Sequence, residues 1–341
     1  MKSTQIDYLN IGLMFLALVL ALKIPFELFL FSYAVLGPLH YLTEINWLKE
    51  RNYFAKNKNV FWVMLVLAAV VSFGPVINSL SKWDLTADLF SFWPESGLRK
   101  FLGLWTPTAI FISLVAGISF VLFQKTWITL AISALAAILG YFIQEQNAYI
   151  VLLGTFLPTL IHVYIFTGLF MLYGALKTKS TPGLISVACL LACAFVIMNY
   201  SFKKFAMPSD ATNAAFNSSS FSGVIEKIID TFQLKMQFVD SLNITFIRIQ
   251  SFVAFAYTYH YLNWFSKTSI IKWHQVEKKQ LVFIGAVWVG SVGLYYYDYH
   301  VGLIVLFLLS FMHVLLEFPL NVASVKGIIN VARGKEKTNR F

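Results

Sequence analysis

Charge is what this chain has least of. Only 12% of its 341 residues are Asp, Glu, Lys or Arg, whereas 58% are hydrophobic and the mean hydropathy is +0.71. A soluble globular domain carries about 25% charged residues, because water must be met by polar surface. The composition therefore excludes an ordinary soluble domain and indicates an integral membrane protein.

Cysteine is nearly absent as well. The chain has two cysteines, Cys189 and Cys193, which lie four residues apart in one apolar segment and so face the same side of a helix. This spacing excludes a disulfide framework of the kind that holds small secreted domains together. The two thiols are interpreted as small packing residues.

Acidic residues are the rarer of the two charge types. The chain has 26 Lys and Arg against 16 Asp and Glu, giving a net charge of +10. The basic residues lie in short clusters between apolar segments, where the positive-inside rule of membrane proteins accounts for them. Nucleic acid is therefore excluded as an expected partner.

Long apolar segments are abundant, and a membrane-spanning helix needs about 20 mostly apolar residues. The sequence predicts an all-α, polytopic bundle of about ten transmembrane helices, with residues 1–341 forming a single multi-pass membrane domain. The predicted spans are residues 6–22, 24–48, 59–80, 100–123, 126–143, 148–176, 183–202, 244–265, 280–298 and 299–322.

The orientation of these spans follows from Lys and Arg. With the amino terminus inside, 17 basic residues lie on the inner side and 8 on the outer side, while Arg248 lies within a span. Basic residues concentrate on the cytoplasmic side of membrane proteins. We therefore expect both termini to be cytoplasmic and the protein to be integral to the cytoplasmic (inner) membrane, in contact with its lipids.

Two outer connections are long. Residues 81–99 mix aromatic and acidic side chains, and residues 203–243 contain apolar residues at helical spacing. Both patterns are typical of interfacial segments that rest on the outer leaflet, and a lid over a pocket is the alternative.

Four histidines lie within apolar spans, one in each of four spans. They are His40, His162, His260 and His313. An ionisable residue in hydrocarbon costs about 2.5–3.5 kcal/mol by insertion scales, so its presence points to a functional site. The four spans run in the same direction, which makes one shared site at a similar depth geometrically reasonable.

Carboxylates accompany two of these histidines. Glu44 follows His40 and Glu317 follows His313, each by four residues and hence on one helix face. Asn263 follows His260 by three residues on the same face. Because imidazole binds iron, copper and zinc and usually donates its other N–H to an oxygen, these three residues are predicted supporting partners or additional ligands.

Non-catalytic interpretations of the same residues stay open. A histidine in a span can simply be a packed, hydrogen-bonded residue, and the protein can be a structural subunit of a membrane assembly or a transporter. Protein partners would accompany the subunit interpretation. If a metal is bound, haem with His162 and His260 as axial ligands is an alternative to a non-haem ion. His274 and His300 are interpreted as surface residues.

Two motifs resemble those of a known family. The stretch Gly37-Pro-Leu-His40 with Glu44, together with Tyr259-His-Tyr261, is similar to the histidine motifs of the Brp/Blh family of membrane-embedded carotenoid-cleaving dioxygenases. The match covers short segments, and Leu39 and Tyr41 depart from the family pattern.

This resemblance implies a reaction. It implies Fe(II) held by histidines, molecular oxygen as co-substrate, and cleavage of β-carotene to retinal. The sequence thus leads to a membrane-embedded, histidine-ligated metal oxygenase, with iron as the expected ion and an apolar small molecule as the expected substrate. The histidine clusters of membrane desaturases and hydroxylases, HxxxH and HxxHH, are absent from the sequence.

The predicted orientation can be tested by cysteine-accessibility labelling. Because basic residues favour the inner side, a cysteine at position 54 or in the carboxy-terminal tail should react only with reagent on the cytoplasmic side. A cysteine at position 215 should react only from outside. Labelling of position 215 from the cytoplasmic side would contradict the orientation.

Overall fold

The helices of the chain follow its apolar segments. A computed structural model describes residues 3–50, 60–123, 125–202, 205, 207–219, 221–239, 242–267 and 275–334. Its longer helices are α1 (Ser3–Lys23), α4 (Val60–Leu80), α5 (Gly97–Phe123), α6 (Thr126–Ile143), α9 (Thr181–Asn199), α12 (Ile244–Ser266), α14 (Lys278–Tyr297) and α15 (Tyr299–Ala332).

Shorter helices and a small hairpin complete the described structure. They are α2 (Pro25–Phe31), α3 (Gly37–Glu50), α7 (Asn147–Val151), α8 (Thr167–Thr178), α10 (Asp210–Ser218), α11 (Phe221–Thr231) and two π-helices, η1 (Ser32–Leu36) and η3 (Leu152–Phe166). Strands β1 (Phe238–Val239) and β2 (Leu242–Asn243) pair antiparallel, with Phe238 opposite Asn243. The predicted all-α fold class is confirmed.

Nine helical segments among the described residues are long and apolar enough to cross a membrane. They coincide with nine of the ten predicted spans. The tenth, residues 244–265, is the helix α12, but it is not among the nine, because polar residues that include Arg248, Gln250, His260 and Asn263 lower its hydropathy. The chain therefore has the helices of a membrane protein, while the number of spans and the side of each terminus stay predictions.

The chain folds into two compact units, each built from segments that are far apart in the sequence. Unit 1 contains residues 1–40, 163–292 and 327–341, and unit 2 contains residues 41–162 and 293–326. One boundary falls within α3, directly after His40, and another within η3, directly after His162. The single domain over residues 1–341 stays a prediction.

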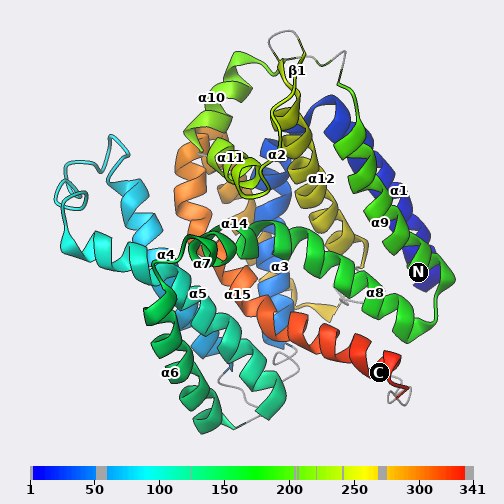
Figure 1. Cartoon of the computed structure of the whole chain (residues 1–341), viewed down its shortest axis with the longest axis horizontal. Coiled ribbons are helices and arrows are strands. Elements are labelled where there is room, and N and C mark those ends of the chain that lie inside the picture. Colours follow the sequence, from blue (N-terminus) through cyan, green and yellow to red (C-terminus); the bar gives the residue numbers. More distant parts are fainter. Residues whose placement is uncertain are drawn as a thin grey trace. The chain divides into compact units, whose positions relative to one another are not determined.

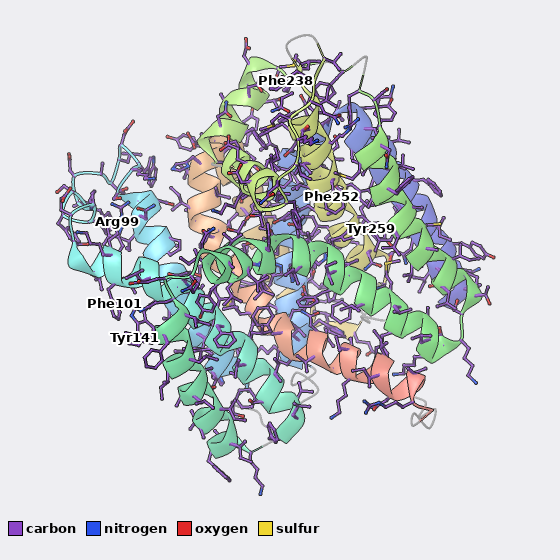
Figure 2. The ribbon with its side chains drawn as sticks, in the orientation of Figure 1. Arg99, Phe101, Tyr141, Phe238, Phe252 and Tyr259 are labelled. Carbon is purple, nitrogen blue, oxygen red and sulfur yellow. The ribbon has the colours of Figure 1, made fainter. Side chains whose placement is uncertain are left out.

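Helix α12 is the central helix of unit 1. Of its 23 residues, 17 are buried, and it packs against α1, α2, α9 and α11 (Figure 1). In Figure 2 its labelled side chains include Phe252, whose ring lies 5.0 Å from that of Tyr164, and Tyr259, which donates a hydrogen bond to Met171 Sδ at 3.3 Å. Helix α12 thus carries its polar groups in the interior of the unit.

The buried polar groups of unit 1 are joined across helices. Ser32 Oγ lies 2.7 Å from Thr258 Oγ1, and Ser266 Oγ donates a hydrogen bond of 3.0 Å to Asn10 Oδ1. Gln250 Nε2 donates to the carbonyl of Pro25 at 3.2 Å. Because an unpaired polar group is costly in an apolar interior, these bonds fix the rotation of α12 about its axis.

Unit 2 is organised around α5, which packs against α4 and α6. Gly140 of α6 allows α5 to approach closely, because a Cβ added at this position would lie only 2.6 Å from Thr108 Cγ2. Figure 2 shows Phe101 of α5 and Tyr141 of α6, which both lie within ring contact of Trp105, with centroids at 5.7 and 6.1 Å. Small residues and rings therefore set this helix contact.

The two connections that the sequence predicts to be on the outer side differ in structure. Residues 81–95 form consecutive turns with exposed Leu85 and Leu89. In the described part of residues 203–243, α11 buries Ile225, Ile228 and Ile229 and packs on α12. Protein therefore covers the isoleucines of α11, while Phe232, directly after the helix, is 61% exposed, and the interfacial segment stays a prediction.

Two π-helical segments precede or contain site histidines. η1 ends at Leu36, four residues before His40, and η3 contains both Pro158 and His162. Proline removes a backbone N–H and so disturbs the regular helical ladder, and π-helical turns often occur at functional sites. In unit 1, Trp288 Nε1 donates to the carbonyl of Val35 within η1 at 2.8 Å, which stabilises the irregular turn.

Candidate metal centre

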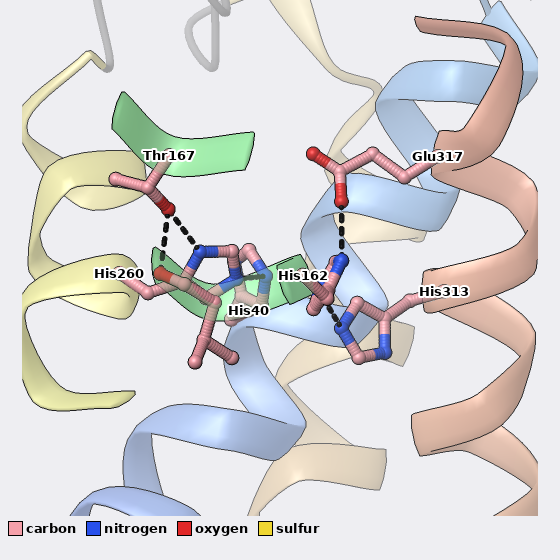
Figure 3. A network of polar contacts seen from close by, with 7 residues as sticks. His40, His162, Thr167, His260, His313 and Glu317 are labelled. Carbon is pink, nitrogen blue, oxygen red and sulfur yellow. Dashed lines mark hydrogen bonds and ion pairs between the residues drawn. The ribbon is translucent and has the colours of Figure 1, made fainter. Parts of the chain in front are cut away.

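His40 and His260 form a buried pair in unit 1. His40 follows the π-helical turn at the start of α3, and His260 lies in the central helix α12. Their Nε2 atoms are 3.0 Å apart, and the two side chains are 1% and 6% exposed (Figure 3). The pair joins two segments that are 220 residues apart in the sequence.

Thr167 lies at the Nδ1 side of His260. Its Oγ1 donates its only proton to the carbonyl of Val163 at 2.9 Å and lies 2.7 Å from His260 Nδ1 (Figure 3). With the hydroxyl proton directed to the Val163 carbonyl, the oxygen is left to accept from an N–H at Nδ1. Neutral His260 therefore carries its lone electron pair on Nε2, the atom that faces His40.

Aromatic rings surround His40. The centroids of Tyr261, Trp264 and Phe265 lie 5.1, 5.5 and 6.5 Å from that of its imidazole. These rings hold the imidazole in place and keep bulk water from it.

A second buried pair, His162 and His313, lies in unit 2. The Nε2 atoms are 3.1 Å apart, and the exposed fractions are 1% and 3%. Glu317 Oε2 lies 3.0 Å from His162 Nδ1 (Figure 3). That distance is within ion-pair range, although the direction is not that of a hydrogen bond. A carboxylate there favours the proton on Nδ1, which again leaves Nε2 able to bind an ion.

Tyr41 positions His313. Its ring stacks on the imidazole with a centroid separation of 4.0 Å and an interplanar angle of 21°. Tyr41 is 2% exposed, so the stack is an internal one. The contact limits rotation of the His313 ring about its side-chain bonds.

In each histidine pair the distance between the two Nε2 atoms is compatible with both nitrogens binding one metal ion. With metal–nitrogen bonds of about 2.05 Å, separations of 3.0 and 3.1 Å correspond to an angle of about 95° at the ion, which is near octahedral. Tetrahedral ligands would be about 3.3 Å apart. Direct N–H···N hydrogen bonds have similar separations, so the distance alone does not distinguish the two arrangements.

The relative orientation of the two imidazole rings in each pair also bears on whether they share a metal ion or a hydrogen bond. A straight N–H···N bond places the two ring axes in line and the centroids about 5.3 Å apart, whereas axes that converge on one ion place them about 4.7 Å apart. The centroids of His40 and His260 are 4.6 Å apart, and those of His162 and His313 are 5.0 Å apart. The first pair has the convergent arrangement, and the second lies between the two.

The structure places every predicted site residue that it describes in the interior. His40, His260 and His313 are buried, and each offers a ring nitrogen that could bind a metal ion. Glu44 and Asn263 are 1% and 5% exposed. His274 lies outside the described residues, and His300 is half-buried.

The supporting contacts differ from the expected ones. The oxygen at His260 Nδ1 belongs to Thr167, and Glu317 approaches His162 of a different helix, whereas the sequence pattern associates it with His313 of its own helix. Thr167 and Tyr41 are functional candidates that sequence reasoning missed. Each lies close in the sequence to a site histidine, which is the one feature that could have identified it. Thr167 is a hydroxyl residue five positions after His162, and Tyr41 directly follows His40.

Unit 1 also contains a cavity of about 180 Å³ that none of the histidines lines. Its walls include Phe26, Phe205, Phe246 and Ile247 from α2, α12 and the outer connection. An engineered apolar cavity of about 150 Å³ holds a benzene molecule, so this one has room for a single small ring.

Comparison with known proteins gives no relative for this chain. No protein-family model, no curated protein and no solved structure matches it. The site must therefore be interpreted from its own geometry.

The role of Thr167 can be tested by substitution. Thr167→Val keeps the shape but removes the oxygen that accepts from His260, so the buried N–H loses its partner and stability should fall by about 1–3 kcal/mol. Nitrogen-15 NMR of histidine-labelled protein should show His260 losing its preference for the Nδ1–H tautomer. Thr167→Ser, the matched control, should retain both the stability and the Nδ1–H tautomer. An unchanged tautomer in Thr167→Val would contradict the role assigned to Thr167.

Proposed function

We propose that this chain is a membrane-embedded metalloprotein in which His40, His162, His260 and His313 bind transition metal. The observation that carries the proposal is the pair of Nε2–Nε2 separations, 3.0 and 3.1 Å, between buried imidazoles. In each pair one ring has an oxygen at its Nδ1. Metal-binding histidines commonly have such an oxygen, because it fixes the tautomer and orients the ring.

Iron is the ion we favour, and an oxygenase reaction the chemistry. His40, His162, His260 and His313, with the Glu317 carboxylate beside one of them, form a donor set that would suit Fe(II). Fe(II) held this way, with coordination positions left open, supplies activation of molecular oxygen. The resemblance of Gly37-Pro-Leu-His40 and Tyr259-His-Tyr261 to carotenoid-cleaving dioxygenases supports the same choice.

The residues of the chain would have distinct roles in such a site. Thr167 holds His260 in the metal-binding tautomer, and Glu317 does the same for His162. Tyr41 fixes the plane of His313. The rings around His40 exclude water and present an apolar surface, so the substrate we propose is a lipid-soluble molecule, most specifically a carotenoid.

A non-catalytic function is the second candidate, and one observation favours it. Both nitrogen separations also satisfy the geometry of a hydrogen bond, so the pairs can join helices without an ion. The protein would then be a structural subunit or a transporter with protein partners. It would purify without metal and lose stability when either partner of a pair is removed.

Metal content separates the two candidates. Protein purified from an iron-replete host, or reloaded with Fe(II) under anaerobic conditions, should contain about one or two ions per chain. Replacing any of the four histidines by Ala should lower the occupancy sharply, because neighbouring groups do not replace a lost ligand. Glu317→Gln and Glu44→Gln should weaken affinity by roughly 10–100-fold if these carboxylates only orient ligands.

His300→Ala and His274→Ala are the matched controls for this experiment and should leave the metal content unchanged. An absorption spectrum of the same preparation distinguishes non-haem iron from haem. A folded wild-type protein that binds neither Fe(II), Zn(II) nor copper would reject the metalloprotein and leave the hydrogen-bonded pairs.

The oxygenase reaction has its own test. Expression in a carotene-accumulating bacterial host should bleach the pigment and yield an apocarotenal, most simply retinal. His260→Ala should leave the pigment intact, since it removes a proposed ligand. Unchanged carotene with metal-loaded wild-type protein would reject carotenoid cleavage and retain the metal site.

A further inference from the structure

Asn321 is a buried amide of unit 2 that the metal site does not use. It lies in α15 and is 3% exposed, and neither its Nδ2 nor its Oδ1 has a hydrogen-bond partner among the described residues. An amide has two donor hydrogens and one acceptor oxygen, and leaving them all unpaired in an apolar interior destabilises the fold. Such a group indicates a hydrogen-bonding partner beyond the described residues.

The position of Asn321 connects it with the second histidine pair. It follows Glu317 by four residues and His313 by eight, so the three side chains lie along one face of α15. Residues four apart on a helix have Cβ atoms about 5–6 Å apart, close enough to interact. The Asn321 amide makes no direct hydrogen bond to Glu317, which is itself a described residue, and two bonds of about 2.8 Å through one water would span this gap.

The stretch of α15 around Asn321 is buried. Leu315, Leu316 and Phe318 are 0% exposed, and an added Cβ at Gly117 of α5 would lie 3.1 Å from Phe318 Cβ, so protein covers this stretch closely. Pro319 has no N–H to contribute. A buried water needs two to four polar partners, and the Asn321 amide together with the Glu317 carboxylate supplies that number.

We propose that Asn321 and Glu317 bind an internal water, which accepts a hydrogen bond from Asn321 Nδ2 and donates one to the Glu317 carboxylate. Glu317 Oε2 lies 3.0 Å from His162 Nδ1, so the water extends a polar chain from His162 through Glu317 to Asn321. Asn321 is thereby a positioning residue for the carboxylate. This inference concerns the proposed site, but the water requires no metal.

Asn321→Leu tests whether the amide binds water, because the expected change in Tm differs between a hydrated amide and a dry one. If the amide holds water, the substitution removes its hydrogen bonds, and the apparent Tm in detergent should fall by several degrees. If the amide is dry, an apolar side chain of similar size should leave the Tm unchanged or raise it. An unchanged or raised Tm would therefore overturn the proposal.

Infrared spectroscopy of metal-free protein tests the link to Glu317. The carboxyl band of Glu317, identified by its loss in Glu317→Gln, should shift in Asn321→Leu because the carboxylate loses a donor. A lowered Tm with an unmoved band would overturn the bridge between the two residues. Failure of the metal proposal shows separately, as absence of bound ion, and changes neither measurement.

Asn10→Leu is the matched control. Asn10 is also a buried amide, but it bonds to the Ile6 carbonyl and accepts from Ser266 within unit 1. Its replacement should lower the Tm and leave the Glu317 band in place.

Discussion

The hydrogen bond between Thr167 and His260 is the interaction on which the interpretation of this protein depends. Thr167 Oγ1 lies 2.9 Å from the Val163 carbonyl and 2.7 Å from His260 Nδ1, and a hydroxyl proton directed to the carbonyl leaves the oxygen to accept from the imidazole. That fixes Nε2 of His260 as the atom with the lone electron pair, 3.0 Å from Nε2 of His40. The hydroxyl thus orients the buried imidazole, and in the proposed site this would direct Nε2 at a metal ion. Glu317 has the corresponding place beside His162 in unit 2.

The distribution of polar residues over the helices follows from the need to pair polar groups in an apolar environment. A polar group in an apolar environment must be paired, so the helix with the most polar side chains has to be the most enclosed. Helix α12 buries 17 of its 23 residues, whereas only 17% of the residues of α6 are buried. The polar contacts of α12 with Ser32, Pro25 and Asn10 hold it in register. Low hydropathy therefore marks the central helix of unit 1.

The sequence predicted the helices and the site residues better than it predicted their contacts. Apolar length alone located nine spans, and the cost of intramembrane histidine singled out four residues that all prove to be buried. Which histidine pairs with which depends on contacts 220 and 151 residues apart in the chain, and helical periodicity carries no information about those. For the same reason Glu317 was associated with His313, the histidine within its own helix. Thr167 and Tyr41 were missed because hydroxyl and aromatic residues are common in spans, and the π-helical turns were missed because proline predicts a disturbance of the helix without specifying its form.

X-ray absorption at the metal edge tests the central claim most directly, because it reports the ligands of the ion themselves. Protein loaded with Fe(II) should show nitrogen neighbours at about 2.0–2.2 Å together with the outer-shell scattering of rigid imidazole rings. That scattering should weaken in proportion when His260 is replaced. A spectrum with oxygen neighbours only, identical in wild type and His260→Ala, would show that the ion binds elsewhere and would contradict the assignment of the histidine pairs as a metal centre.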